Sequence, residues 1–192
     1  MKKLIFATHN QNKIQEVKAV FKGFSVVSLA DLEYHQDIAE TEKTFVGNAL
    51  VKARHVFELF KLPVFADDSG LEVFALDGAP GIYSARYAGE EKNHTKNNDK
   101  LLDALANETN RVAQFKTVIA YKDANTEITF EGIVKGVIAK KTLGSGGFGY
   151  DPVFIPEGFD KTFGELPKEI KLHLSHRSLA VGKLHHYLNS IT

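Results

Sequence analysis

The chain has 192 residues, 43% hydrophobic and 25% charged, which is typical of a soluble globular protein with a substantial core. Lysine plus arginine number 24, as do aspartate plus glutamate, so no net charge favours a nucleic-acid polymer or an anionic membrane. Cysteine is absent, which excludes disulfides and thiolate metal sites and suits a cytoplasmic protein. We expect one domain over residues 1–192, without a membrane helix.

The first part of the chain alternates between strand and helix patterns. In chain order it predicts a strand over 3–8, a helix over 14–21 that Gly23 ends, a strand over 24–29, a polar loop over 31–43, a helix over 44–60, a strand over 62–68 that ends at Ser69-Gly70, and an extended segment over 71–76. The helices show apolar residues at helical spacing, and the strands are rich in β-branched and aromatic residues.

The second part predicts a turn-rich segment and a long hairpin. The elements are turns over 78–91, a helix over 97–106, strands over 111–123 and 126–139, a glycine-rich loop over 143–152, a short strand over 153–155 and a C-terminal helix through Leu184, Leu188 and Ile191. This order predicts an α/β protein with a mixed twisted sheet and flanking helices.

The stretch ATHNQNK, residues 7–13, places a polar loop between a predicted strand and a predicted helix. Helix N-termini present unpaired N–H groups and a partial positive charge, which suit phosphate, and Lys13 adds a full charge. An alternative is that Thr8, Asn10 and Asn12 serve only to cap the helix.

The stretch FADDSGLEVFAL, residues 65–76, places two adjacent carboxylates at the predicted end of a strand. Alternate strand residues face opposite sides, so Asp67 and Asp68 should point apart unless Ser69-Gly70 re-aims the second. The pair could form a turn, or one carboxylate could bind magnesium together with substrate phosphates.

Two later stretches carry further candidates. In GGFGYDPVF, residues 146–154, glycines allow close approach of the backbone, and Phe148 and Tyr150 suit stacking on a base. A wide turn with core aromatics is the alternative. A local basic cluster follows, and its members are Lys168, Lys171, His176 and Arg177. It could bind phosphate or a base edge, or could be an ordinary solvated helix start.

In this order, five motifs resemble the noncanonical purine nucleoside triphosphate pyrophosphatase family, also called the inosine triphosphate pyrophosphatase or HAM1-like family. They are ATHNQNK, ETEKTFVGNALVKA, FADDSGLEVFALDGAPGIYSARYAG, GGFGYDPVF and KLHLSHR, and together they span residues 7–177. The resemblance implies two lobes around a central cleft, a homodimer, and Mg²⁺-dependent hydrolysis of dITP, ITP and XTP to the monophosphate and pyrophosphate. The implied role is to clean the nucleotide pool.

The resemblance also implies site residues. Asp68 would be the general base and a metal ligand, Glu40 would assist with the metal, and Ser69 would touch substrate. The remaining substrate-binding residues would be Thr8, His9, Asn10, Gln11, Asn12, Lys13 and Lys52 at the phosphates, with Phe148, Gly149, Tyr150, Asp151, Lys171, His176 and Arg177 at the base. Donors there would select a 6-keto oxygen, because a 6-amino group leaves buried donors unpaired.

The chain departs from the family pattern at two positions. Gly47 precedes Asn48 where an acidic residue is common, which makes Glu40 and Glu42 the expected source of a further carboxylate, and His9 stands where glycine is frequent. The rival interpretations are a Maf-like pyrophosphatase, a nucleotide sensor without hydrolysis and a haloacid-dehalogenase-like phosphatase. The last requires aspartates two positions apart, whereas here they are adjacent.

Overall fold

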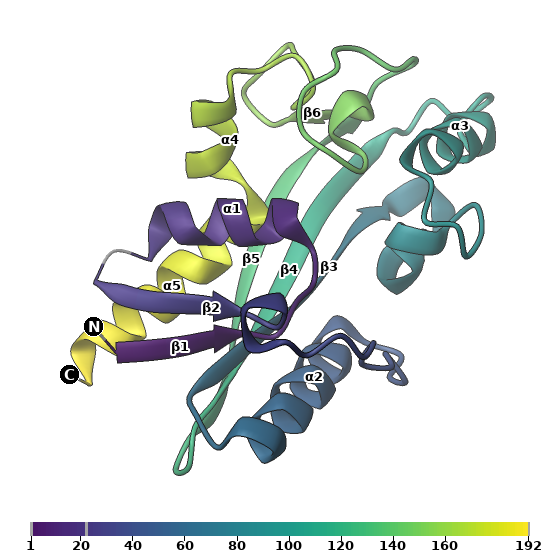
Figure 1. The fold of residues 1–192 in the computed structure, drawn as a ribbon. Coiled ribbons are helices and arrows are strands. Elements are labelled where there is room, and N and C mark those ends of the chain that lie inside the picture. Colours follow the sequence, from purple (N-terminus) through teal and green to yellow (C-terminus); the bar gives the residue numbers. More distant parts are fainter. Residues whose placement is uncertain (1, 22, 192) are drawn as a thin grey trace. The chain divides into compact units, whose positions relative to one another are not determined.

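The computed structural model describes residues 2–21 and 23–191 (Figure 1). The strands are β1 (Lys2–Phe6), β2 (Phe24–Ser28), β3 (Val64–Val73), β4 (Val112–Lys122), β5 (Glu127–Ile138) and β6 (Phe154–Pro156). The helices are α1 (Gln11–Val20), α2 (Phe45–Phe60), α3 (His94–Ala104), α4 (Lys168–Leu174) and α5 (His176–Ser190). The predicted α/β class with a mixed sheet is confirmed, and the six strands are ordered β2-β1-β3-β4-β5-β6.

By its internal contacts the chain divides into two compact units. The first contains Met1–Asp68, Thr117–Gly132 and His176–Thr192, and the second contains Ser69–Lys116 and Ile133–Ser175. Strands β3, β4 and β5 each carry residues of both units. Among the described residues, no helix is both long enough and apolar enough to cross a membrane.

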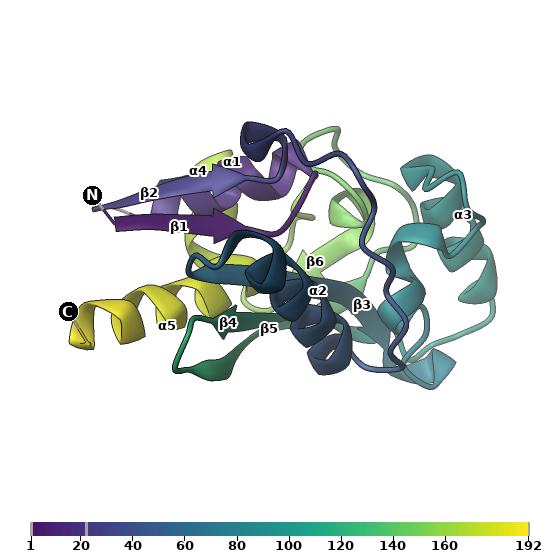
Figure 2. The ribbon, with the colours of Figure 1, turned by 60° about the horizontal axis from the view of Figure 1, so that its bottom comes forward.

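The first unit is built on three parallel strands. Strand β1 pairs with β2 on one side and with β3 on the other, with Phe6 opposite Phe65. The rings of Phe6 and Phe65 stack at a centroid distance of 4.5 Å, in a core that also contains the buried faces of α1 and α5. Figures 1 and 2 show α1 and α2 on opposite sides of β1. Residues of β3 therefore face α1 and α5 on one side and α2 on the other.

The second unit has its own apolar core. Phe154 of β6 lies 5.7 Å from Phe163 and 4.6 Å from Phe115 of β4, measured between ring centroids. Leu101 and Leu105 add the inner face of α3 and the turn after it. Helix α3 begins at His94, earlier than predicted, because the side chain of Asn93 accepts a hydrogen bond from the Lys96 N–H at 3.0 Å.

The predicted break at Ser69-Gly70 is wrong. Strand β3 runs from Val64 to Val73 without interruption, and the expected extended segment 71–76 instead ends in a 3₁₀ turn over Phe74–Leu76. Local preference favoured a turn at the serine and glycine, but the segment belongs to a strand of the sheet, where β4 is its neighbour beyond the short pairing of β1 with Val64 and Phe65. The sides that Asp67 and Asp68 face therefore follow from strand alternation alone.

Gly132 of β5 lies close to the backbone at the start of α5. A Cβ at this position would lie 2.0 Å from the His176 carbonyl oxygen and 2.6 Å from the Ala180 nitrogen. Both neighbours are backbone atoms of α5, so a side chain at 132 would displace the helix that carries His176 and Arg177.

We therefore expect Gly132→Ala to lower the free energy of unfolding by about 1–3 kcal/mol through overpacking. Gly182, in the middle of α5, is the matched control, because a Cβ there meets nothing within 4 Å. Gly182→Ala should raise stability by about 0.5–1 kcal/mol. Urea unfolding followed by circular dichroism measures both. Equal stability of the two variants would contradict the close contact.

Candidate active site

The loop after β1 carries the predicted phosphate-binding residues. Asn10 caps α1, because its side chain accepts hydrogen bonds from the N–H groups of Asn12 at 3.0 Å and Lys13 at 3.3 Å. Thr8 in turn accepts from the Asn10 N–H at 3.2 Å, and Gln11 begins the helix with an exposed side chain. A capping role is therefore confirmed for Asn10, whereas Asn12 contributes its backbone N–H to this cap. Phosphate binding by the same loop stays a prediction.

His9 connects this loop to the segment that precedes α2. Its Nε2 donates to the carbonyl oxygen of Gln36 at 3.1 Å, and its ring lies parallel to that of Tyr34, at a centroid distance of 6.4 Å. A glycine at position 9 could make neither contact. The imidazole therefore links the start of α1 to the segment that leads to Glu40.

Asp67 lies at the centre of a buried ion network on the α1 and α5 side of β3. Lys13 Nζ is 2.9 Å from its Oδ2, and Arg177 Nε is 3.2 Å from the same oxygen. Arg177 also forms an ion pair with Glu16 of α1. Burial disfavours the Asp67 carboxylate, but Lys13 and Arg177 outweigh it and hold its pKa well below the usual range.

The pKa values of the two cations of this network shift in opposite directions. Burial lowers the pKa of Lys13, although Asp67 opposes the shift. Burial also acts against the Arg177 cation, but the carboxylates of Asp67 and Glu16 raise its pKa. Arg177 is thus held as a cation on the same side of the strand as Lys13.

Asp68 faces α2, on the opposite side of the strand. Its Oδ2 accepts a hydrogen bond from Asn48 Nδ2 at 3.0 Å, and its Oδ1 is 3.8 Å from Lys52 Nζ. Burial raises the pKa of Asp68 to about 6, and the charge of Glu40 adds to the shift against the opposing effect of Lys52. The alternation that the sequence predicted for the two aspartates is confirmed.

Lys52 contacts both predicted metal ligands, Glu40 and Asp68. Its Nζ lies 2.6 Å from Glu40 Oε1 and 3.8 Å from Asp68 Oδ1. The carboxylates of Glu40 and Asp68 therefore lie near each other, and the raised pKa of Asp68 shows that its negative charge is not fully compensated. A hard cation would stabilise this pair, and Mg²⁺ prefers one or two carboxylates plus substrate phosphates. The described residues contain no group of three or more carboxylate or imidazole side chains placed to hold a metal by themselves.

Gly47 explains how the helix start accommodates the acidic segment before it. A Cβ at Gly47 would lie 2.6 Å from Cβ of Glu42, so the Glu42 side chain fills that space. Asn48 Oδ1 accepts from the Glu42 N–H at 2.9 Å, while its Nδ2 donates to Asp68. Asn48 therefore links the segment that contains Glu42 to the carboxylate of Asp68.

The second unit holds the predicted base-binding residues. Asp151 Oδ2 accepts from the Phe148 N–H at 2.7 Å and from Lys171 Nζ at 2.6 Å. Lys171 Nζ also lies 4.4 Å from the centroid of the Phe148 ring, and the Tyr150 hydroxyl donates to the Ser84 carbonyl at 2.8 Å. These contacts give the loop a defined shape around one charged pair and one aromatic face.

The structure groups the predicted residues into two sets. In the first unit lie Thr8, His9, Asn10, Gln11, Asn12, Lys13, Glu40, Lys52, Asp68, His176 and Arg177, and in the second lie Ser69, Phe148, Gly149, Tyr150, Asp151 and Lys171. Arg177 was expected at the base, but its guanidinium is bound by Asp67 and Glu16. His176, next to it, is buried at the start of α5.

Sequence reasoning missed two polar residues of the charged site. Glu16 lies on the buried face of α1, three positions after Lys13, and that helical spacing was the signal that could have found it. Asn48 is buried on α2, four positions before Lys52, on the face that meets Asp68. Both reach their partners only through tertiary packing.

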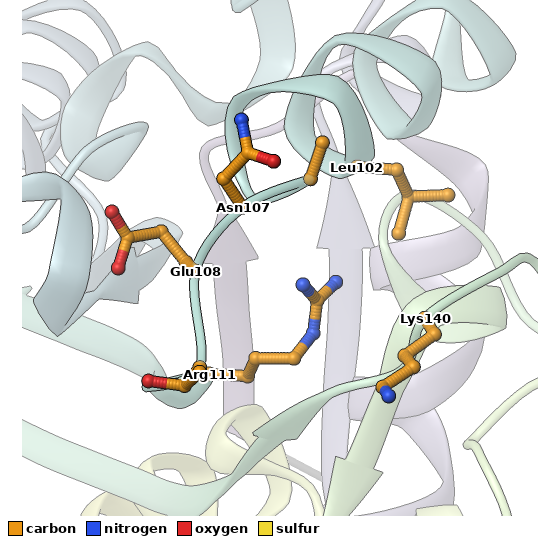
Figure 3. A pocket seen from close by; sticks show the side chains of 7 residues that line it. Leu102, Asn107, Glu108, Arg111 and Lys140 are labelled. Carbon is orange, nitrogen blue, oxygen red and sulfur yellow. The ribbon is translucent and has the colours of Figure 1, made fainter.

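A separate pocket in the second unit contains none of the predicted residues. It has a volume of about 590 Å³ and lies around Leu102, Asn107, Glu108, Arg111 and Lys140 (Figure 3). Arg111 donates to the carbonyl oxygens of Ile138, Leu105 and Ala139 at 2.7–2.8 Å. Its guanidinium therefore holds together two segments of this unit, the turn after α3 and the end of β5.

These contacts define an α/β protein with a buried cluster of acidic and basic side chains beside the loop that follows the parallel strand β1. The chain belongs to the Ham1 family, whose model matches residues 4–187. It is 51% identical over 183 residues to a dITP/XTP pyrophosphatase of Flavobacterium johnsoniae, covering 95% of each chain. It is 50% identical over 190 residues to a dITP/XTP pyrophosphatase of Porphyromonas gingivalis, covering 98% of each. The solved Ham1 protein of Staphylococcus aureus superposes with a TM-score of 0.92 at 43% identity, over 100% of both chains.

The two adjacent aspartates should have opposite effects on stability in the metal-free protein. Asp67→Asn should lower the free energy of unfolding at pH 8 by about 3 kcal/mol, because Lys13 and Arg177 lose a buried counter-charge. Asp68→Asn should raise it by about 1–2 kcal/mol, because the burial cost of the charged carboxylate disappears. Urea unfolding in the presence of a chelator measures both.

The pH dependence of these effects follows from the two pKa shifts. The folded pKa of Asp68 is about 6, above the ordinary 3.8, so its charge costs stability fully above pH 6 and hardly at pH 4. The gain in Asp68→Asn should therefore vanish near pH 4. Asp67 has a folded pKa below 3.8, so its contribution is present at pH 8 and is lost only in stronger acid. A gain in Asp68→Asn that is equal at pH 4 and pH 8 would contradict this account.

Proposed function

We propose that this chain is a Mg²⁺-dependent nucleoside triphosphate pyrophosphatase that hydrolyses dITP, ITP and XTP to the monophosphate and pyrophosphate. The relatives named dITP/XTP pyrophosphatase, matched over nearly their whole length, support the reaction and the substrate class. The observation that carries the proposal for this chain is the separation of roles at one strand. Asp67 is neutralised by two cations, while Asp68 shares Lys52 with Glu40.

Asp68 is the proposed general base. It is 5% exposed and directed toward α2, with its Oδ2 oriented by Asn48. In the proposed step a water oxygen bonds to the α-phosphorus, the bond from that phosphorus to the α,β-bridging oxygen breaks, and Asp68 takes the proton from water. The products are the monophosphate and pyrophosphate. Burial excludes bulk water from the carboxylate and fixes its direction.

The cations bind and orient the triphosphate in this proposal. Lys13 lies in the first turn of α1, whose N-terminal end favours anions, and Asp67 holds its ammonium in place. Lys52 offsets charge near Asp68. Asp68 and Glu40 would hold the magnesium ion, which when bound neutralises phosphate charge and acidifies water. The polar loop Thr8 to Lys13 would contact the phosphates.

The loop of the second unit is proposed to bind the purine. The Phe148 ring offers a stacking face, and Gly149, Tyr150 and Asp151 surround it together with Lys171. Ser69, His176 and Arg177 are further proposed substrate contacts. We also propose that the chain works as one catalytic domain over residues 1–192, in a cytoplasmic homodimer that binds neither a nucleic-acid polymer nor a membrane.

The direct test is release of pyrophosphate from dITP, XTP, dGTP and ATP with and without magnesium. We expect rapid release from dITP and XTP, slow release from dGTP and ATP, and loss of activity without the metal. Activity that is unaffected by chelation would overturn the metal requirement. A panel dominated by other bases would favour the Maf-like alternative, and binding without release would favour the sensor.

The role of Asp68 is tested by the isosteric variant Asp68→Asn. We expect kcat for dITP to fall by about 10²–10⁴-fold, the range typical of removing a general base. The expected stability gain of the metal-free variant separates this loss from unfolding. Glu127→Gln is the matched control, since this carboxylate forms a surface pair with Arg54 and should leave kcat unchanged. Normal turnover of dITP by Asp68→Asn would refute the assignment.

A further inference from the structure

The glycine-rich loop of the second unit presents two consecutive main-chain N–H groups. Among the described residues, neither the Gly149 N–H nor the Tyr150 N–H has a hydrogen-bond acceptor, whereas the N–H groups of Phe148 and Asp151 are both bonded within the loop. Gly149 has φ +64° and Tyr150 has φ −92° and ψ 10°. Successive residues of opposite hand turn their N–H groups to one side and create a concave site for an atom with partial negative charge.

The orientation of this peptide is held from α3. Asn98 is buried, and its Nδ2 donates to the Gly149 carbonyl oxygen at 3.1 Å. The peptide that joins Gly149 and Tyr150 is planar, with its C=O and N–H pointing in opposite directions. A contact that holds the carbonyl toward α3 therefore also turns the Tyr150 N–H away from α3.

We propose that Asn98 is a positioning residue for purine selectivity, which keeps the Tyr150 N–H turned toward the base so that it donates to the 6-keto oxygen. This inference rests on the proposed function, in which the loop of Phe148 receives the purine. Were the same peptide to turn over, its carbonyl would replace the N–H and would accept a hydrogen bond from the 6-amino group of adenine. Glycine at 149 permits either orientation, so the neighbour decides between them.

The contrast with Asn97 argues that the Asn98 amide is not only a structural connection. Asn97 uses both ends of its side chain, since Oδ1 accepts from the Ala88 N–H at 2.7 Å and Nδ2 donates to the Ala85 carbonyl at 3.0 Å. Asn98 uses its donor on Gly149, while its buried Oδ1 has no partner among the described residues. Only the donor is needed to orient a carbonyl, and neither leucine nor aspartate can supply it.

The test compares Asn98→Leu and Asn98→Asp with the wild-type protein on three triphosphates in the presence of magnesium. They are dITP, dATP and deoxynebularine triphosphate, which carry oxygen, an amino group and hydrogen at position 6. For the wild type we expect kcat/KM for dITP to exceed that for deoxynebularine triphosphate by about tenfold or more. In both variants the preference for dITP over dATP should fall by about tenfold or more. Asn98→Asp should lose the most, because its carboxylate repels the Gly149 carbonyl.

Asn93→Ala is the control for a general loss of α3 stability. Asn93 is exposed and caps α3 by accepting a hydrogen bond from the Lys96 N–H. It should lower the melting temperature without changing the ratio of kcat/KM for dITP and dATP. Folded Asn98 variants that keep the wild-type ratio would overturn the inference.

The remaining outcomes separate this inference from the proposed function. A wild-type protein that releases no pyrophosphate from dITP would remove the proposed function itself. A wild-type protein that is active, but uses dITP and deoxynebularine triphosphate equally well, would overturn only the assignment of the N–H donor. That comparison needs no substitution, so it can overturn the inference even if both Asn98 variants fail to fold.

Discussion

The ion network around Asp67 is the interaction on which the site of the first unit depends. Its carboxylate is nearly inaccessible to water and pairs with Lys13 from α1 and Arg177 from α5. The two helices must therefore lie in register with β3 before this charge can be buried at acceptable cost. Glu16 completes the charge balance by pairing with Arg177. Helix packing and electrostatics are thus coupled at a single residue.

The same coupling gives the neighbouring carboxylate a different environment. Asp67 pairs with Lys13 and Arg177 on one side of the strand, whereas Asp68 on the other side meets Asn48 and the shared Lys52. Two residues of identical chemistry thus acquire opposite pKa shifts from opposite faces of one strand. A strand is suited to this separation, because its alternation places adjacent side chains in different environments without a change of backbone.

In the second unit, hydrogen bonds from distant residues hold the candidate binding loop in place. The loop from Phe148 to Asp151 is shaped by Asp151, which binds both the Phe148 N–H and Lys171, and by Asn98 at the Gly149 carbonyl. Glycine supplies the conformational freedom, and these contacts remove it again. The shape of the loop is therefore set in part by residues distant in sequence, on α3 and α4.

Most elements of the fold followed from the sequence, because apolar periodicity and capping residues such as Thr44 act over a few neighbouring residues. The ordered motifs also determined the family, and strand alternation determined that Asp67 and Asp68 face apart. Only the tertiary structure decided that β3 continues through Ser69-Gly70, since that depends on a sheet neighbour, β4, that lies far away in sequence. Only the tertiary structure placed Arg177 against Asp67, 110 residues away in sequence, because the gain from a buried ion pair arises after distant helices have packed.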